Sequence, residues 1–194
     1  VCGASGGLGE QMAYQYAKLG ARLVLVARRE AELEKVAEEA RRLGAASAVP
    51  VVGDMADDAS VARTVSAALD SFGGDAMDVL VLNHAMQYWG WFLGDFDLRS
   101  DTNVNSDGNE DTLNDARLGR TSSHVSFAAI DKMVRVNYLS FVKLATLATP
   151  ALARGALSRQ ADGGNDRARG RIIVVSSGGG KVTVPLQSLY SGAK

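Results

Sequence analysis

Short apolar runs alternate with amphipathic segments along most of this chain, and that alternation restricts its fold more than any other feature of the sequence. Residues 22–27 and 171–176 are nearly continuous in apolar side chains, as is usual for strands buried on both faces of a sheet. Between such runs, segments such as 30–43 carry apolar residues at helical spacing and charged residues elsewhere. The pattern predicts an α/β fold, a doubly wound parallel sheet in three layers with its ligand at the carboxyl ends of the strands.

The expected elements follow one another without an internal repeat. In chain order, we expect the end of a strand at 1–2, a helix at about 10–19, a strand at 22–27, a helix at about 33–43 and a strand at 48–52. A helix at about 61–72 and a strand at 78–83 follow. The last expected elements are a helix at about 127–153, a strand at 171–176 and a helix that starts near Tyr190. Two polar stretches, at about 95–125 and 154–170, interrupt the pattern and are expected to be loops. We interpret residues 1–194 as a single Rossmann domain that is incomplete at both ends.

Composition excludes several classes of protein. Lys and Arg number 21 and Asp and Glu 22, so the net charge of −1 predicts no surface for nucleic acid or for an acidic membrane. The single cysteine excludes an intrachain disulfide framework and a cysteine-rich metal site, and two isolated histidines, His84 and His124, predict no metal site either. The sequence has no run of about 20 apolar residues, so it predicts no membrane span. A leader or an anchor is expected only upstream of Val1.

A glycine-rich loop lies between the first expected strand and the first expected helix, where such a loop can bind a nucleotide. Glycines there allow a tight turn and let backbone N–H groups approach a pyrophosphate at the helix N-terminus. Two spacings are possible: Gly3, Gly7 and Gly9, or Gly3, Gly6 and Gly9. A plain tight turn is the alternative interpretation of the same residues.

The residues after the 22–27 strand bear on which nucleotide is bound. Folds that bind NAD usually place an acidic residue there, on the ribose 2′-hydroxyl, whereas this chain has Arg28 and Arg29. Guanidinium groups bind a 2′-phosphate in bidentate fashion, and Ser5 of the loop can add a hydrogen bond. We therefore predict NADP(H) rather than NAD(H); the alternative is that both arginines only solvate the first turn of a helix. Asp54 is placed to accept a hydrogen bond from an adenine amino group, or else it caps a turn.

Three residues near the end of the chain suggest a catalytic group. Tyr190 and Lys194 are four positions apart, so they share one face of a helix. Ser177 ends the last expected strand, thirteen positions before Tyr190. Each residue alone has an ordinary structural explanation, as a helix-start residue or a cap, but the combination on these elements favours a site.

Taken together, these motifs resemble those of the short-chain dehydrogenase/reductase family. The resemblance rests on the glycine loop, Asn83-His84-Ala85 after the 78–83 strand, Asn137 in the long helix, Ser177, Tyr190 and Lys194. The spacing of Ser177 and Tyr190 is similar to that of the compact branch rather than the epimerases, and it selects the spacing Gly3, Gly7 and Gly9. Within this branch, Gly44–Ala48, Leu82–His84 and Gly180–Val182 are similar to the type 1 11β-hydroxysteroid dehydrogenases and their relatives.

The resemblance implies an NADP(H)-dependent oxidoreductase that interconverts a carbonyl and a secondary alcohol, with a steroid or another lipophilic molecule as a possible substrate. Tyr190 would be the general acid or base, and Lys194 would favour its phenolate. Ser177 would stabilise the substrate oxygen, and Asn137 would hold a water that connects Lys194 to solvent. The implied cofactor-binding residues are Gly3, Ser5, Gly7, Leu8, Gly9, Arg28, Arg29, Asp54, Met55, Asn83, His84, Ala85, Tyr190 and Lys194. His84 is interpreted as structural, with the lining of the pocket as the alternative.

Cys2 replaces the family's usual threonine and His84 replaces a second asparagine, and neither change removes the backbone contacts. The larger departure is that the sequence has no counterpart of the family's last strands and substrate loop. An alternative function is therefore a non-catalytic, truncated nucleotide-binding module that lacks the substrate pocket. The resemblance further predicts a homodimer, and a location either in the cytoplasm or at the endoplasmic reticulum membrane.

Overall fold

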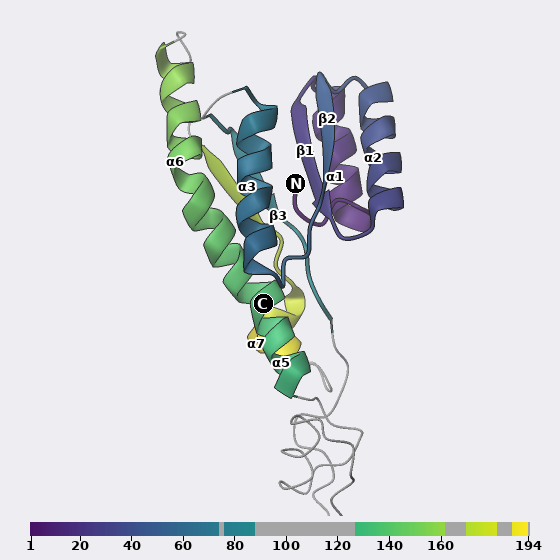
Figure 1. Ribbon diagram of the computed structural model, residues 1–194, viewed down its shortest axis with the longest axis vertical. Coiled ribbons are helices and arrows are strands. Elements are labelled where there is room, and N and C mark those ends of the chain that lie inside the picture. The colour runs from purple at the N-terminus through teal and green to yellow at the C-terminus, as the bar shows by residue number, and fades with distance from the viewer. Residues whose placement is uncertain (74–75, 88–126, 162–169, 182–187, 194) are drawn as a thin grey trace, which may run out of the picture. The chain divides into compact units, whose positions relative to one another are not determined.

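The computed structural model describes residues 1–73, 76–87, 127–161, 170–181 and 188–193 (Figure 1). The chain divides into two compact units, each described by itself. The first unit comprises residues 1–85 and 139–176, and the second comprises residues 86–138 and 177–194. The predicted loop at 95–125 and the predicted catalytic residue Lys194 lie outside the described residues.

The first unit is built on a parallel sheet. β1 (Arg22–Ala27) pairs with β2 (Ser47–Val52), and β3 (Val79–Leu82) pairs with β4 (Arg171–Val174). Cys2 forms parallel bridges to both Val26 and Leu82, so the start of the chain lies between β1 and β3. The order across the sheet is therefore β2, β1, the Cys2 segment, β3 and β4, which confirms the parallel α/β fold predicted from the alternation of apolar runs.

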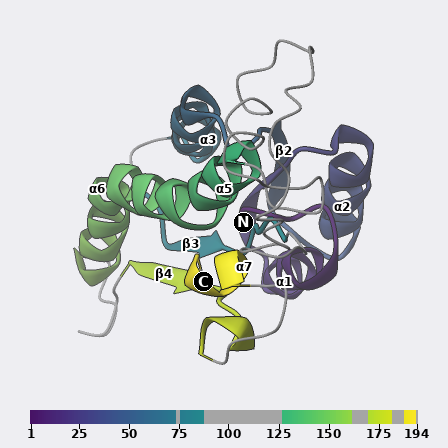
Figure 2. The ribbon, with the colours of Figure 1, turned by 90° about the horizontal axis from the view of Figure 1, so that it is seen from below.

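Helices cover both faces of this sheet (Figure 2). α1 (Gly7–Lys18) and α2 (Glu30–Arg42) lie on one face, and α3 (Asp58–Ser71) and α6 (Ser140–Ala161) lie on the other. Among the described residues, no helix combines the length and the apolarity that crossing a bilayer requires.

The side chains of β1 explain why two separate cores form. Successive strand residues point to opposite faces, so Leu23 and Leu25 join the core under α1 and α2, whereas Val24 and Val26 join the core under α3 and α6. Each core is closed by the apolar stripe of its helices, such as Leu33, Val36, Ala37 and Ala40 of α2. A continuous apolar strand is thus required at the centre of a three-layer fold.

The long predicted helix differs from the observed one in two ways. A π-helical segment, η1 (Arg135–Leu139), separates α5 (Phe127–Val134) from α6, and α6 continues to Ala161 although the sequence predicts a polar loop from residue 154. Tertiary packing accounts for the extension: Gly155 lies so close to the start of β3 that a Cβ atom on it would approach the carbonyl oxygen of Met77 to 2.4 Å. Periodicity along the chain does not show such a contact.

The second unit contains short elements. Its described part includes α5, most of η1, a 3₁₀ turn named η2 (Gly178–Gly180) and α7 (Ser188–Gly192). α5 and α7 contact one another within this unit. The turn and α7 occupy the segment where Ser177 and Tyr190 are predicted to act.

We predict that Leu25→Ala destabilises the first unit by about 2–5 kcal/mol, because it removes a buried side chain and leaves a cavity. Leu25 is 0% exposed, whereas Leu19, at the end of α1, is 81% exposed. Leu19→Ala is therefore the matched control and should change the free energy of unfolding by less than about 0.5 kcal/mol. Urea denaturation followed by circular dichroism measures both; equal effects of the two substitutions would contradict the assigned core.

Candidate functional site

The glycine loop lies at the carboxyl ends of β1 and β3 in the first unit. Gly3 and Ala4 donate their backbone N–H groups to the carbonyl of Val26, at 2.8 and 3.1 Å, and α1 begins four residues later at Gly7. Gly6 precedes α1 and provides no side-chain cap, whereas Asp57 caps α3 by accepting from Ala59 and Ser60. The first N–H groups of α1 are therefore left for an external acceptor, which fits a phosphate.

The glycine loop packs closely against the residues that follow β3. A Cβ atom on Gly3 would lie 2.7 Å from both the Cα and the N atom of His84, and one on Gly9 would lie 2.0 Å from the carbonyl oxygen of Gly3. Asn83 completes the contact, since its Nδ2 donates to that same oxygen at 3.1 Å. Glycine is thus required at positions 3 and 9 by close backbone approach, and Gly3 also adopts a positive φ of 79°.

Of the two arginines after β1, Arg29 lies beside the loop. The guanidinium of Arg29 donates to the side-chain oxygen of Ser5 at 3.2 Å and to its backbone carbonyl at 3.3 Å. Arg29 also lies 3.7 Å from the carboxylate of Glu32 and is largely exposed, as is Arg28. The structure therefore places a cationic, hydrogen-bonding group next to the loop residue that the sequence analysis selected.

Asp54 and Met55, the two candidate residues after β2, have few groups available for binding a nucleotide. The Oδ1 atom of Asp54 accepts from the backbone of Ala56 at 3.0 Å, so the carboxylate already stabilises its own turn. Met55 is 6% exposed and its side chain belongs to the core under α3 and α6. Only the backbone of Met55 and the second carboxylate oxygen of Asp54 remain for a nucleotide.

Cys2 is a structural residue of the sheet. It is 1% exposed, and burial raises the pKa of its thiol. A buried, protonated thiol is a poor nucleophile, so the side chain contributes packing between β1 and β3.

Ser177 and Tyr190 come together in the second unit. The Oγ atom of Ser177 accepts from the backbone N–H of Gly179 at 3.1 Å, as the cap of η2. A Cβ atom on Gly179 would lie 3.5 Å from that Oγ and 3.4 Å from Cε1 of Tyr190, so both predicted catalytic side chains border the same small residue. The sequence analysis identified the two side chains but not Gly179; its place between a strand-end serine and a tyrosine helix was the only available signal.

Asn137 lies in η1, also in the second unit, and both ends of its side chain are used. Its Oδ1 accepts from the backbone N–H of Met86 at 2.7 Å, and its Nδ2 donates to the carbonyl of Met86 at 2.8 Å. A paired amide of this kind fixes the segment that follows the Asn83–Ala85 stretch. Met86 could not be found from the sequence, because only its backbone takes part.

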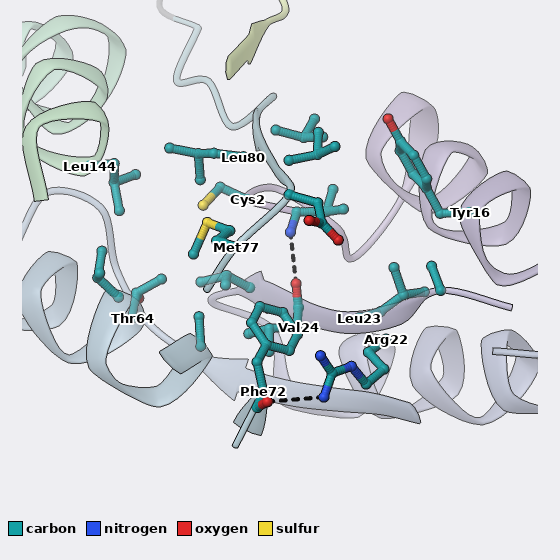
Figure 3. A pocket seen from close by; sticks show the side chains of 18 of the residues that line it. Cys2, Tyr16, Arg22, Leu23, Val24, Thr64, Phe72, Met77, Leu80 and Leu144 are labelled. Atoms are coloured by element: carbon teal, nitrogen blue, oxygen red, sulfur yellow. Dashed lines mark hydrogen bonds between the residues drawn. The ribbon is translucent and has the colours of Figure 1, made fainter. Parts of the chain in front are cut away.

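A cavity of about 280 Å³ in the first unit is separate from the loop (Figure 3). It is bordered by residues of β1 and β3, with Val24, Met77 and Leu80 among them, and Arg22 is hydrogen-bonded to the Phe72 carbonyl at 2.9 Å. The residues predicted to bind a nucleotide follow the carboxyl ends of these parallel strands, and none of them lines the cavity. Within the described part of the chain, no three potential metal-ligating side chains converge.

A parallel sheet, an uncapped glycine-rich helix start and an arginine pair after β1 are together typical of nucleotide-binding α/β proteins. A family model described as short chain dehydrogenase matches residues 1–106 and 113–194. The chain therefore belongs to the short-chain dehydrogenase family, which confirms the resemblance drawn from its motifs.

Relatives within this family include two hydroxysteroid 11-beta-dehydrogenase 1-like proteins. The protein of Gallus gallus is 34% identical over 99% of this chain, and that of Xenopus tropicalis is 35% identical over 100% of it. The chain spans about half the length of these relatives, 51% and 52% respectively.

Two solved structures are similar over the whole chain. A metagenomic short-chain oxidoreductase in complex with NADP is 25% identical, with a TM-score of 0.73 and 68% of its own chain covered. An alcohol dehydrogenase from the archaeon Thermococcus sibiricus, complexed with 5-hydroxy-NADP, is 22% identical, with a TM-score of 0.70 and 63% of its chain covered, and it shows the fold alone.

We predict that Gly9→Ala destabilises the first unit by about 3 kcal/mol or more, because the added methyl group would overlap the backbone of Gly3. Gly6→Ala is the matched control within the same loop: its Cβ would lie 3.5 Å from the nearest atom, on Arg29, and its φ of 169° is ordinary extended backbone. Thermal unfolding of the two variants measures the difference in their stability. A Gly9→Ala chain as stable as Gly6→Ala would show that the loop does not pack as described.

Proposed function

We propose that this chain contains the nucleotide-binding and catalytic residues of an NADP(H)-dependent oxidoreductase that interconverts a carbonyl and a secondary alcohol. The observation that carries the proposal is that α1 starts without a side-chain cap, beside the guanidinium of Arg29. That guanidinium donates to the Oγ atom of Ser5 at 3.2 Å. Family membership supports the reaction class, and the NADP found in one similar structure supports the cofactor.

The residues of the first unit would bind the nucleotide by charge and by backbone contacts. The free N–H groups at the start of α1 would receive the pyrophosphate, and Gly7, which is exposed and has nothing near its missing Cβ, leaves open space for its approach. Arg28 and Arg29 would bind the 2′-phosphate, which an acidic residue at this place would repel. Asn83 would act through its bond to Gly3, which keeps the loop in the shape that a nucleotide needs.

The residues of the second unit would hydrogen-bond the substrate oxygen and transfer a proton to or from it. When bound, the cofactor supplies or accepts a hydride at the substrate carbon, and the oxygen must gain or lose a proton in the same reaction. Because Ser177 accepts a hydrogen bond from Gly179, its own hydroxyl proton is left to donate to that oxygen. Tyr190 would transfer the proton, with Lys194 favouring the phenolate.

Asn137 would hold the water that the family resemblance implies through groups other than those that it bonds to Met86. The family resemblance implies that it holds a water, but its side chain is paired with the backbone of Met86 at both ends. Holding a water would therefore fall to its backbone carbonyl or to the second N–H of the amide. Its side chain would position the segment after β3.

The names of the relatives favour a steroid or another lipophilic carbonyl compound as the substrate class. Assembly as a homodimer, and a location either in the cytoplasm or at the endoplasmic reticulum membrane, stay predictions from the family resemblance.

We predict that the chain binds NADPH more tightly than NADH and that the double variant Arg28→Ala, Arg29→Ala loses this preference. Loss of charge-assisted bonds to the 2′-phosphate should weaken NADPH binding about 10- to 100-fold and leave NADH binding nearly unchanged. Isothermal titration calorimetry with each cofactor measures both affinities. The control is Arg42→Ala, Arg63→Ala, which removes two exposed arginines paired with other carboxylates. A double variant at 28 and 29 that still preferred NADPH would disprove the assignment.

We predict that Tyr190→Phe lowers turnover of a carbonyl compound about 100- to 10,000-fold, because it removes the proton donor. The phenyl ring keeps its contact with Gly179, so NADPH affinity should change little. Tyr138→Phe, which alters a tyrosine that is 57% exposed, is the matched control and should keep full activity. NADPH oxidation at 340 nm in the presence of aryl ketones gives the rates. Unchanged turnover in Tyr190→Phe would remove Tyr190 from the mechanism, and NADPH binding without any turnover in the unaltered chain would favour the non-catalytic alternative.

A further inference from the structure

A buried hydrogen bond joins the end of β3 to the first residue of α6, both in the first unit. Nε2 of His84 lies 2.7 Å from Oγ of Ser140, and the two residues are 9% and 1% exposed. A hydrogen bond of this length in a buried environment is electrostatically stronger than one in water. It links two segments that are separated by 56 positions in the sequence.

The next residue of α6 holds the same imidazole from another side. The rings of His84 and Phe141 are 4.5 Å apart between centroids and 65° apart in orientation, an edge-to-face contact. Consecutive residues at the start of α6 therefore determine both the hydrogen bond and the tilt of the His84 ring. The imidazole is directed into the packing of α6, which agrees with the structural role expected for His84.

The backbone of His84 forms one wall of the glycine loop. Its N and Cα atoms both lie 2.7 Å from the point where Gly3 would carry a Cβ, and the preceding residue, Asn83, donates its backbone N–H to Cys2 at 3.2 Å. Gly3 is in turn pressed against Gly9 at the start of α1. Because each of these contacts is close, a shift of His84 has no empty space to absorb it before it reaches the loop.

We propose that Ser140 is a positioning residue of the nucleotide site. Its hydrogen bond to the imidazole fixes the backbone of His84, against which Gly3 and the start of α1 are packed. Ser140 acts on the loop through its hydrogen bond to His84. The proposal rests on the proposed function for its effect on NADPH, but its effect on the loop stands independently of any cofactor.

The first test measures the loop without cofactor. In Ser140→Ala, hydrogen exchange followed by NMR should be about 3- to 10-fold faster at the amides of Gly3, Ala4 and Asn83, which hydrogen-bond to Val26 and Cys2. The amides of α2 should exchange at the unaltered rate, since α2 packs in the other core. A general loss of stability would accelerate both sets, so this contrast separates positioning from ordinary destabilisation.

The second test measures affinity. Ser140→Ala should weaken NADPH binding about 3- to 10-fold by calorimetry, and Thr149→Ala should leave it unchanged. Thr149 is the matched control, because its hydroxyl lies on the same helix but is exposed and donates to the carbonyl of Ala145. Should Ser140→Ala fail to fold, Ser140→Cys decides the question, since it keeps the size of the side chain and weakens only the hydrogen bond.

Distinct outcomes separate the two proposals. Faster exchange at the three loop amides supports the role of Ser140 whether or not NADPH binds, whereas absence of NADPH binding in the unaltered chain overturns the proposed function alone. Unchanged exchange at these amides in the folded Ser140 variants overturns the role of Ser140. Equal effects of Thr149→Ala and Ser140→Ala overturn it as well, because any hydroxyl of α6 would then serve.

Discussion

The backbone of Val1 and Cys2 joins the two halves of the sheet. Val1 exchanges hydrogen bonds with β1, since its backbone nitrogen donates to Val24 and its carbonyl accepts from Val26, at 2.7 and 2.9 Å. Cys2 does the same with β3, donating to Val81 at 2.9 Å and accepting from Asn83 at 3.2 Å. Without this segment, β1 with β2 and β3 with β4 would be separate pairs, and the two helical layers would have no common sheet to cover.

The position of the nucleotide loop follows from that central segment. The chain leaves the sheet at Gly3, between the carboxyl ends of β1 and β3, and must turn at once into α1. The turn fits only because neither Gly3 nor Gly9 carries a Cβ atom, and it leaves the N–H groups of α1 directed outward. The same close packing connects the loop to His84, through which Ser140 at the start of α6 is proposed to act on the site.

Small residues have a comparable importance in the second unit. Gly179 provides the N–H group that directs the Ser177 hydroxyl, and its missing side chain leaves room beside the ring of Tyr190. Both units thus rely on backbone groups to arrange the side chains proposed to act. Such groups are already oriented by the fold, so a site built on them needs little reorganisation when a substrate arrives.

How far the sequence predicts this protein depends on the kind of interaction. The β1 strand was predicted at its observed bounds, because a strand buried on both faces must be apolar throughout. The structure places Arg29 against Ser5 of the predicted glycine loop, whereas the binding of a nucleotide by these residues stays a prediction. The end of α6 was predicted too early, because the packing of Gly155 on Met77 joins residues far apart in the chain. Ser140 gave no signal at all, since one serine among the apolar residues of a helix resembles any other.

The sequence by itself determined the fold class, the order of strands and helices, and the residue types available for nucleotide and proton chemistry, because these depend on local periodicity and on motifs within a few residues. Only the tertiary structure decided which side chains are already engaged: Asn137 with Met86, and His84 with Ser140. The physical reason is that a polar group's partner is set by distances across the fold, which a pattern along the chain does not contain.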